Sequence, residues 1–288
     1  MWSDSVQKLI SLALQEDDVE RDITSSLLLP PHVWAKAKVQ AKQSGVLAGN
    51  ALLKPLFENT SVVGQPQAND GENVHPHQIV ATLEGKLYEI LSRERVFLNF
   101  LMRLSGIATL TQQFVQQAAP LGIEILDTRK TTPGLRELEK YAVRMGGGKN
   151  QRLNLSHQIL IKENHLAAFT TPKEALKQLY QKLKKMNQNI FVQIEVENLF
   201  ELQNILQHPP HPNAVLLDNM TPPQIRQAVE IRNQCAKNVL LEVSGGIRLE
   251  NLHHYLIPGI NRISIGSLTH SATALDFSLQ VEEVRANG

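Results

Sequence analysis

The chain has 288 residues, and 29 lysine and arginine residues against 28 acidic ones give a formal net charge of +1. A dedicated binder of duplex DNA or RNA usually carries a basic excess, because neutralisation of phosphates drives its affinity, so nucleic acid is not expected as a partner. The hydrophobic content of 42% and the charged content of 20% are typical of a globular protein, and the length predicts two domains or one large barrel with an appendage.

The cysteine content and the first residues bear on the compartment. Cys235 is the only cysteine, so it cannot form a disulfide within the chain, as is usual in a reducing compartment. The N-terminus lacks the basic region and the apolar run of a signal peptide. No apolar run approaches the roughly 18 residues of a membrane span. We therefore expect a soluble cytoplasmic protein with no membrane partner.

The first 120 residues predict helices and short strands. An amphipathic helix begins near Ser3 or Asp4, either of which can cap it. Residues 34–48 alternate loosely and are typical of a strand, while 61–87 place glycines and prolines between short apolar pieces, as short strands and turns do. A helix is predicted over 89–119, with Ser105–Gly106 as a candidate break.

From about residue 121, short apolar runs alternate with helical stretches. The runs lie at 123–127, 158–162, 190–196, 214–218, 239–243 and 261–265. Helices are predicted over 135–145, 199–207, 248–257 and 273–285, and after the capping signals at Thr171 and Thr221. Successive strand–helix units indicate parallel strands. We favour a closed or nearly closed α/β barrel over an open sheet, because polar residues end every strand.

Cations gather after the first two of these strands. Arg129 and Lys130 lie beside three threonines, a composition that suits an anionic ligand, although an isolated pair of this kind is often a solvated turn. Three consecutive glycines precede Lys149 and Arg152, and they predict either a close approach of the backbone to a ligand or a flexible loop. Lys162 ends the second strand, where a lysine can also simply reach solvent.

Carboxylates and glycines follow the later strands. A ring of carboxylates facing cations predicts a site for a substrate that carries phosphates, a metal and a developing positive charge, whereas one carboxylate alone would be a surface residue. The carboxylates are Glu195, Glu197, Asp218 and Glu242. Ser244-Gly245-Gly246 and Gly266-Ser267 follow the last two strands, where barrels bind phosphate through backbone N–H groups and helix N-termini. Ordinary tight turns are the alternative.

Two other chemistries are not expected. The histidines form no set with metal-binding spacing, since His75 and His77 flank a proline and His253 and His254 are adjacent. Cys235 lies in a predicted helix without an activating base, so we do not expect it to act as a nucleophile.

Eight segments spread over most of the chain share the motifs of one known family. They are 44–49, 94–99, 104–109, 127–136, 160–165, 217–220, 244–247 and 268–271. The 127–136 block and the 144–165 stretch are the most specific. On these segments the chain resembles the quinolinate phosphoribosyltransferases, the carboxylating nicotinate-nucleotide pyrophosphorylases of NAD biosynthesis.

The resemblance implies a fold and an assembly. It implies an N-terminal α/β sandwich joined to an incomplete parallel α/β barrel, as in type II phosphoribosyltransferases. The corresponding ranges are 1–110 for the sandwich, 111–272 for the barrel, and 273–288 for a C-terminal helix that packs back on the N-terminal domain. It also implies a homodimer, or a higher oligomer, in which Arg95 is supplied to the partner's site.

The resemblance further implies the reaction and its residues. Phosphoribosyl passes from phosphoribosyl pyrophosphate to quinolinate with decarboxylation, giving nicotinate mononucleotide, pyrophosphate and carbon dioxide, with magnesium as cofactor. The implied catalytic residues are Lys130, Lys162, Glu195 and Asp218. Glu195 and Asp218 match the carboxylates near the ribose and its magnesium. They are implied to bind the magnesium indirectly, together with the pyrophosphate. The implied substrate-binding residues are Arg95, Thr128, Arg129, Lys130, Gln151, Arg152, Lys162, Glu195, Asp218, Ser244, Gly245, Gly246, Ile265, Gly266 and Ser267.

Two positions depart from the family pattern. Gln151 stands where the family usually has His, and Gln can donate to a carboxylate but cannot become cationic. Glu20-Arg21-Asp22 stands where a Gly usually precedes the Asp. Because of Gln151, one alternative is a paralogue on the same scaffold that acts on another anionic acceptor, such as the proteins encoded with molybdate transporters. The intact 127–134 block argues against this alternative. A catalytically silent binder of phosphorylated ligands is the other alternative, and the retained carboxylates argue against that.

Overall fold

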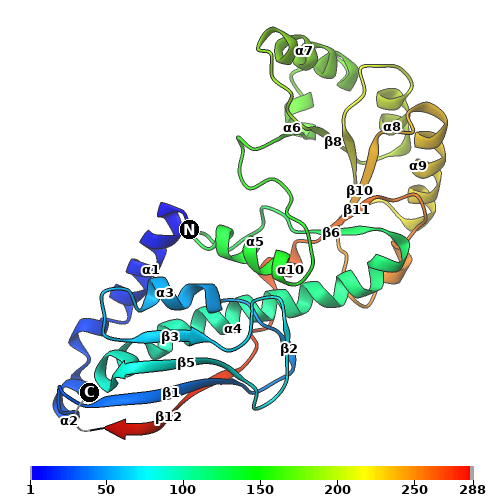
Figure 1. Cartoon of the computed structure of the whole chain (residues 1–288). Helices are drawn as coiled ribbons and strands as arrows, with labels where there is room; N and C mark the ends of the chain where they lie inside the picture. Colours follow the sequence, from blue (N-terminus) through cyan, green and yellow to red (C-terminus); the bar gives the residue numbers. More distant parts are fainter. Residues whose placement is uncertain (1, 286–288) are drawn as a thin grey trace. The chain divides into compact units, whose positions relative to one another are not determined.

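The computed structural model describes residues 2–285 and divides the chain into two compact units (Figure 1). Unit 1 comprises the described residues up to Gln112, Lys130–Gly148 and those from Leu268 onward. Unit 2 comprises Gln113–Arg129 and Lys149–Ser267. The fold class is the predicted one, an α/β unit with an antiparallel sheet and an incomplete parallel α/β barrel. Across residues 2–285, no helix is both long enough and apolar enough to cross a bilayer.

The sheet of unit 1 has four antiparallel strands in the order β12–β1–β5–β3. Its strands are β1 Trp34–Ala41, β3 Val63–Pro66, β5 Ile79–Lys86 and β12 Phe277–Arg285, and β2 Gly45–Val46 pairs with β4 Asn73–Val74. Alternate residues of β1 are buried, namely Ala35, Ala37, Val39 and Ala41, so the strand has one core face.

The helices of unit 1 include the predicted N-terminal helix and one unusually long helix. Ser3 caps the first helix by accepting a hydrogen bond from the Val6 N–H. The 32-residue α4 follows β5 directly, and its last residues belong to unit 2. The bounds are α1 Asp4–Glu16, α2 Ile23–Leu28, α3 Leu53–Leu56, α4 Leu87–Ala118, α5 Arg136–Met145 and α10 Ser267–His270, with 3-10 turns η1 Val19–Arg21 and η2 Asn50–Leu52.

The candidate helix break at Ser105–Gly106 is wrong, because α4 runs through it without interruption. The two small residues serve close packing instead. A Cβ at Gly106 would lie 2.0 Å from the carbonyl oxygen of Thr273. The Ser105 hydroxyl accepts from the Ala48 N–H at 2.9 Å and donates to the Ala48 carbonyl at 3.1 Å.

The predicted C-terminal helix over 273–288 is also wrong for the described residues, because 277–285 form strand β12. This strand pairs along the whole of β1, with Phe277 opposite Ala41 and Arg285 opposite Trp34. Residues 286–288 of that prediction lie outside the described residues.

Unit 2 is built on six parallel strands in the order β6–β11–β10–β9–β8–β7. β6 and β7 are the two edges and do not pair with each other, so the barrel is incomplete between them. All six predicted runs are strands: β6 Glu124–Leu126, β7 Ile159–Ile161, β8 Val192–Val196, β9 Ala214–Asp218, β10 Leu240–Ser244 and β11 Arg262–Ser264.

The helices of unit 2 largely follow the predicted start signals. Thr171 and Thr221 are the N-caps of α7 and α9, each followed by proline in the first turn. The predicted helix over 248–257 is wrong, since only the 3-10 turn η4 Leu252–His254 forms. The Asn251 side chain accepts from the Arg248 N–H at 2.7 Å, a local bond that competes with a helix. The bounds are η3 Ala119–Leu121, α6 Glu163–Leu166, α7 Pro172–Lys185, α8 Leu199–Leu206 and α9 Pro222–Cys235, which places Cys235 at a helix end.

The two units interleave along the chain, whereas the predicted ranges 1–110 and 111–272 are contiguous. Residues 130–148 belong to unit 1 because α5 makes its polar contacts there. The Tyr141 hydroxyl donates to Asp70 at 2.6 Å, and its ring packs edge-on against Trp2. The predicted helix over 135–145 is therefore correct as a helix but packs within unit 1.

Candidate active site

Asp127 fixes the main chain that follows β6 in unit 2. Its side chain is fully buried, its Oδ1 accepts from the Gln151 N–H at 2.9 Å, and its Oδ2 accepts from the Asn150 amide at 2.5 Å. A parallel bridge also joins Leu126 to Lys149. A carboxylate that accepts two such bonds orients its neighbours. Asp127 therefore positions the segment that carries Gln151 and Arg152.

Arg129 and Arg152 place two positive charges in unit 2, the first half-buried and the second buried. Arg152 is 7% exposed, and burial together with the charge of Arg129 lowers its pKa. The Nε of Arg129 is buried with no hydrogen-bond partner among residues 2–285, and neither guanidinium forms an ion pair with a carboxylate of those residues. A buried and a half-buried guanidinium without a protein counterion suit an anionic ligand.

Lys162 and Glu195 are brought together by neighbouring strands. Lys162 follows β7, Glu195 lies on β8, and the ammonium of Lys162 donates to the Oε2 of Glu195. The Glu195 side chain is 12% exposed and that of Lys162 is 45% exposed. Asp218 ends β9, the next strand, and its Oδ2 accepts from the Asn219 amide at 2.8 Å. One cation and two carboxylates thus lie at the ends of three adjacent strands.

The ring of four carboxylates expected from the sequence is not formed. Glu197 lies beyond the end of β8 on the exposed surface, where its N–H donates to Glu201 at the start of α8. Glu242 is 1% exposed. Of these four carboxylates, only Glu195 and Asp218 therefore remain at the strand ends as expected.

Gln151 turns its amide into a buried polar cluster, which we define as Gln151, Gln193, Glu242 and Ser264. Its Nε2 donates to Gln193 at 3.1 Å and, at 3.5 Å, to Glu242. Its Oε1 accepts from the Arg152 N–H at 3.0 Å. Sequence reasoning treated this amide as a donor to a substrate carboxylate, but here it supports the main chain of Arg152.

Glu242 makes the stability of the protein depend on pH. Burial raises its pKa, against the opposing influence of Gln193 and Ser264. Above the ordinary value of 4.5, the folded protein retains a proton that the unfolded chain has lost. The stabilisation is therefore full below pH 4.5 and is lost as the pH rises through the raised pKa, by up to about 1.4 kcal/mol per pH unit.

We expect Glu242→Gln to remove this dependence, because glutamine keeps the shape of the side chain and does not titrate. Urea unfolding between pH 5 and pH 8 should show the variant gaining stability relative to the wild type as the pH rises. Glu58→Gln, at an exposed position, is the matched control. A difference between Glu242→Gln and the wild type that stays constant with pH would contradict this account.

Glycines shape the loop after β10. Gly245 and Gly246 have φ values of +108° and +61°, which favour glycine. A Cβ at Gly245 would lie 2.1 Å from Oδ1 of Asn219, whose N–H donates to the Ser244 carbonyl at 2.9 Å. Because β10 and β11 are neighbours, this loop lies beside the chain that leaves β11 toward Gly266. With no helix following at 248, loop N–H groups rather than a helix terminus would bind an anion here.

Lys130 and Arg95, two further residues singled out from the sequence, belong to unit 1. Lys130 is exposed, and its carbonyl accepts from the Thr269 hydroxyl at 2.7 Å. Arg95 is exposed on α4. Thr128 and Ser267 are half-buried, and Ile265 is buried with its N–H donating to the Leu126 carbonyl. Asn150 and Asn219 are positioning residues that sequence reasoning missed, although both adjoin residues that it selected.

The chain is similar to known proteins over nearly its full length. The family model described as quinolinate phosphoribosyl transferase, N-terminal domain, matches residues 22–105, and the one described as its C-terminal domain matches residues 107–280. A probable carboxylating nicotinate-nucleotide pyrophosphorylase of Bacillus subtilis is 38% identical, over 96% of this chain and 93% of the relative. A chloroplastic carboxylating nicotinate-nucleotide pyrophosphorylase of Arabidopsis thaliana is 36% identical, over 96% and 83%.

The chain is also similar to solved structures over nearly its full length. NadC from Streptococcus pyogenes matches with a TM-score of 0.88 and 35% identity, over 99% of both chains. A nicotinate-nucleotide pyrophosphorylase from Francisella tularensis matches with a TM-score of 0.85 and 33% identity, over 98% of both chains.

Proposed function

Because the chain belongs to the quinolinate phosphoribosyltransferase family and is a carboxylating nicotinate-nucleotide pyrophosphorylase, we propose that the cations and carboxylates described above carry out its reaction. The enzyme joins quinolinate to the phosphoribosyl group of phosphoribosyl pyrophosphate in the de novo synthesis of NAD. Nicotinate mononucleotide, pyrophosphate and carbon dioxide are the products.

The paired guanidiniums of Arg129 and Arg152 are the observation that carries the assignment of residues. Quinolinate is a dianion, and an arginine binds a carboxylate through two parallel hydrogen bonds. Arg152 is buried, Arg129 is half-buried, and the charge of Arg129 acts against the charged form of Arg152, so an anionic ligand would stabilise both cations. We assign the quinolinate carboxylates to these residues, with Lys130 next in the chain as a further cation.

The carboxylates serve the other substrate. As the bond between ribose C1 and the pyrophosphate oxygen breaks, positive charge develops on the ribose. Glu195 and Asp218 are fixed anions that stabilise this charge, and Lys162 holds Glu195 in place through their ion pair. The pyridine nitrogen then bonds to C1. The quinolinate 2-carboxylate leaves as carbon dioxide, its electron pair passes into the cationic ring, and the ring carbon takes up a proton.

We assign the 5′-phosphate of the donor to the loops after the last two strands. The residues are Ser244, Gly245, Gly246, Ile265, Gly266 and Ser267. The positive φ of both glycines and the close packing of Gly245 on Asn219 support this assignment, because they keep side chains out of the loop and leave its backbone approachable.

Magnesium is the proposed cofactor, bound mainly by the pyrophosphate. Within residues 2–285 no group of three or more His, Cys, Asp and Glu side chains could hold a metal ion alone. Glu195 and Asp218 offer the oxygen ligands that magnesium prefers, and one or two carboxylates plus phosphates are its usual set. When bound, magnesium supplies charge neutralisation to the departing pyrophosphate.

One assay tests the proposal. The full chain is mixed with magnesium, quinolinate and phosphoribosyl pyrophosphate, and nicotinate mononucleotide and carbon dioxide are quantified. We expect both products in equal amounts, and their loss when magnesium is chelated. Binding of phosphoribosyl pyrophosphate without product would instead favour a paralogue with another acceptor or a silent binding protein.

We also propose a homodimer in which Arg95 completes the partner's site, supported by its exposed position on α4. Arg95→Ala and Lys162→Ala should each be nearly inactive, yet their mixed dimers should contain one intact site. After subunit exchange, about one quarter of the wild-type activity should return. Native mass spectrometry confirms the mixed dimers, and no recovery in their presence would contradict the shared site.

The cytoplasm is the proposed compartment. Cys235 is half-buried at the end of α9 and has no other cysteine in the chain with which to form a disulfide. Fractionation of cells that carry a tagged copy tests this, and enrichment in an organelle or a membrane fraction would contradict it.

A further inference from the structure

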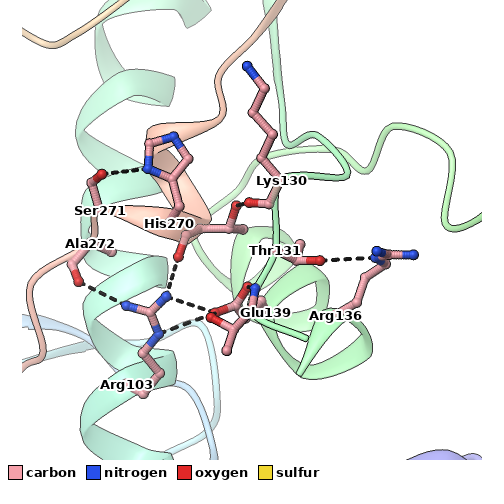
Figure 2. A network of polar contacts seen from close by, with 10 residues as sticks. Arg103, Lys130, Thr131, Arg136, Glu139, His270, Ser271 and Ala272 are labelled. Atoms are coloured by element: carbon pink, nitrogen blue, oxygen red, sulfur yellow. Dashed lines mark hydrogen bonds and ion pairs between the residues drawn. The ribbon is translucent and has the colours of Figure 1, made fainter. Parts of the chain in front are cut away.

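We propose that Thr269, Glu139 and Arg103 form a clamp that positions Lys130 for the reaction, an inference that rests on the proposed catalytic role of Lys130. The three residues and their contacts lie within unit 1 (Figure 2). The segment from Lys130 to Thr132 has no regular secondary structure, so no ladder of backbone hydrogen bonds fixes it. A catalytic side chain on such a segment needs other groups to hold its main chain.

The first part of the clamp holds the segment at both ends. The Thr269 hydroxyl donates to the Lys130 carbonyl at 2.7 Å. The Glu139 carboxylate accepts from the Thr132 N–H at 3.1 Å and from the Thr132 hydroxyl at 2.9 Å. The residue between them, Thr131, accepts from the Arg136 guanidinium at 3.0 Å. The main chain on either side of Thr131 is thus fixed by side chains.

The second part holds the clamp itself. Glu139 is fully buried, and its Oε1 accepts from the Nη2 of Arg103 at 2.7 Å. The same guanidinium donates to the carbonyl of Ala272 at 3.0 Å and to that of Thr269. Arg103 therefore ties Glu139 of α5 and Thr269 of α10 to the long helix α4.

The direction of Lys130 fits this role. In Figure 2 its side chain extends away from the Arg103–Glu139 pair. Its carbonyl accepts the hydrogen bond from Thr269. The clamp therefore holds the main chain of Lys130 rather than its side chain. Buried ion pairs are often replaceable by apolar residues without loss of stability. Here the Glu139 carboxylate also accepts two hydrogen bonds from Thr132, and an apolar residue at this position could not accept them.

Thr269→Val tests the clamp with the least risk to folding, because removing one partner of the buried Arg103–Glu139 pair can unfold the chain. The substitution keeps the shape and removes the hydroxyl that binds Lys130. We expect kcat/KM to fall about ten- to a hundredfold. Thr269→Ser, which keeps the hydroxyl, should restore most of the activity. Thr111→Val is the matched control, because Thr111 is equally buried and its hydroxyl donates to the Ile107 carbonyl within α4.

A double-mutant cycle separates positioning from general destabilisation. In a Lys130→Ala background, Thr269→Val should have almost no further effect on the residual kcat/KM, since the side chain that it positions is gone. The clamp is overturned if Thr269→Val behaves like Thr111→Val, or if it lowers activity by the same factor in both backgrounds. An inactive wild type would instead overturn the proposed function and the clamp with it, so the two failures are distinguishable.

Discussion

Arg152→Ala is expected to lower kcat/KM about a hundred- to a thousandfold, because it removes a preorganised cation from a site with little access to water. The expected effect on stability has the opposite sign. Burial and the charge of Arg129 both act against the charged form of Arg152 and lower its pKa. Removing that charge relieves an unfavourable interaction in the folded protein. If Arg152 is retained for ligand binding although its charge destabilises the fold, its substitution should lower activity and leave stability equal or higher.

Arg152→Met separates the two effects, since it keeps much of the volume and removes the charge. Its free energy of unfolding should equal or exceed that of the wild type, while its activity should be as low as that of Arg152→Ala. Arg152→Lys keeps a charge but not the planar fork, and should recover only part of the activity. Steady-state kinetics and urea unfolding measure both quantities. Near-native kcat/KM in Arg152→Ala would remove Arg152 from the site.

Lys130→Ala is expected to lower kcat/KM by a similar factor, about a hundred- to a thousandfold, with no change in stability. Lys130 is exposed and its main chain is held by Thr269, so truncation of its side chain leaves the clamp intact. Lys149→Ala is the matched control, because Lys149 is an exposed lysine of the same basic stretch, paired with Glu124. Exposed ion pairs contribute little. Equal activities of the two variants would contradict the assignment.

The parallel sheet was predictable because its signals are local. Each strand is a short apolar run, and capping residues such as Thr171 and Thr221 mark where the helices between strands begin. The C-terminal strand was not predictable in this way. Residues 277–285 carry three charged side chains, and their pairing with β1 joins residues more than 230 positions apart. Contacts so distant in sequence override local pattern.

The residue types of the site were predictable, but not the direction in which each side chain turns. Strand ends place Lys162, Glu195 and Asp218 at one edge, which follows from parallel order alone. Glu242 and Gln151 instead turn into the buried polar cluster, and that choice depends on register and rotamers. Glu139 offers no signal beyond a charged residue on a helix, and only the fold reveals its contact with Thr132.

The pairing of β12 with β1 has a consequence for synthesis on the ribosome. The strand that covers one edge of β1 follows it in the chain by more than 230 residues. Between the emergence of β1 and that of β12, this edge of β1 therefore presents a row of unpaired backbone groups, a feature that favours association with other nascent chains. Unit 1 cannot close until β12 has been synthesised, although Ser267, the last residue of unit 2, has by then already been made.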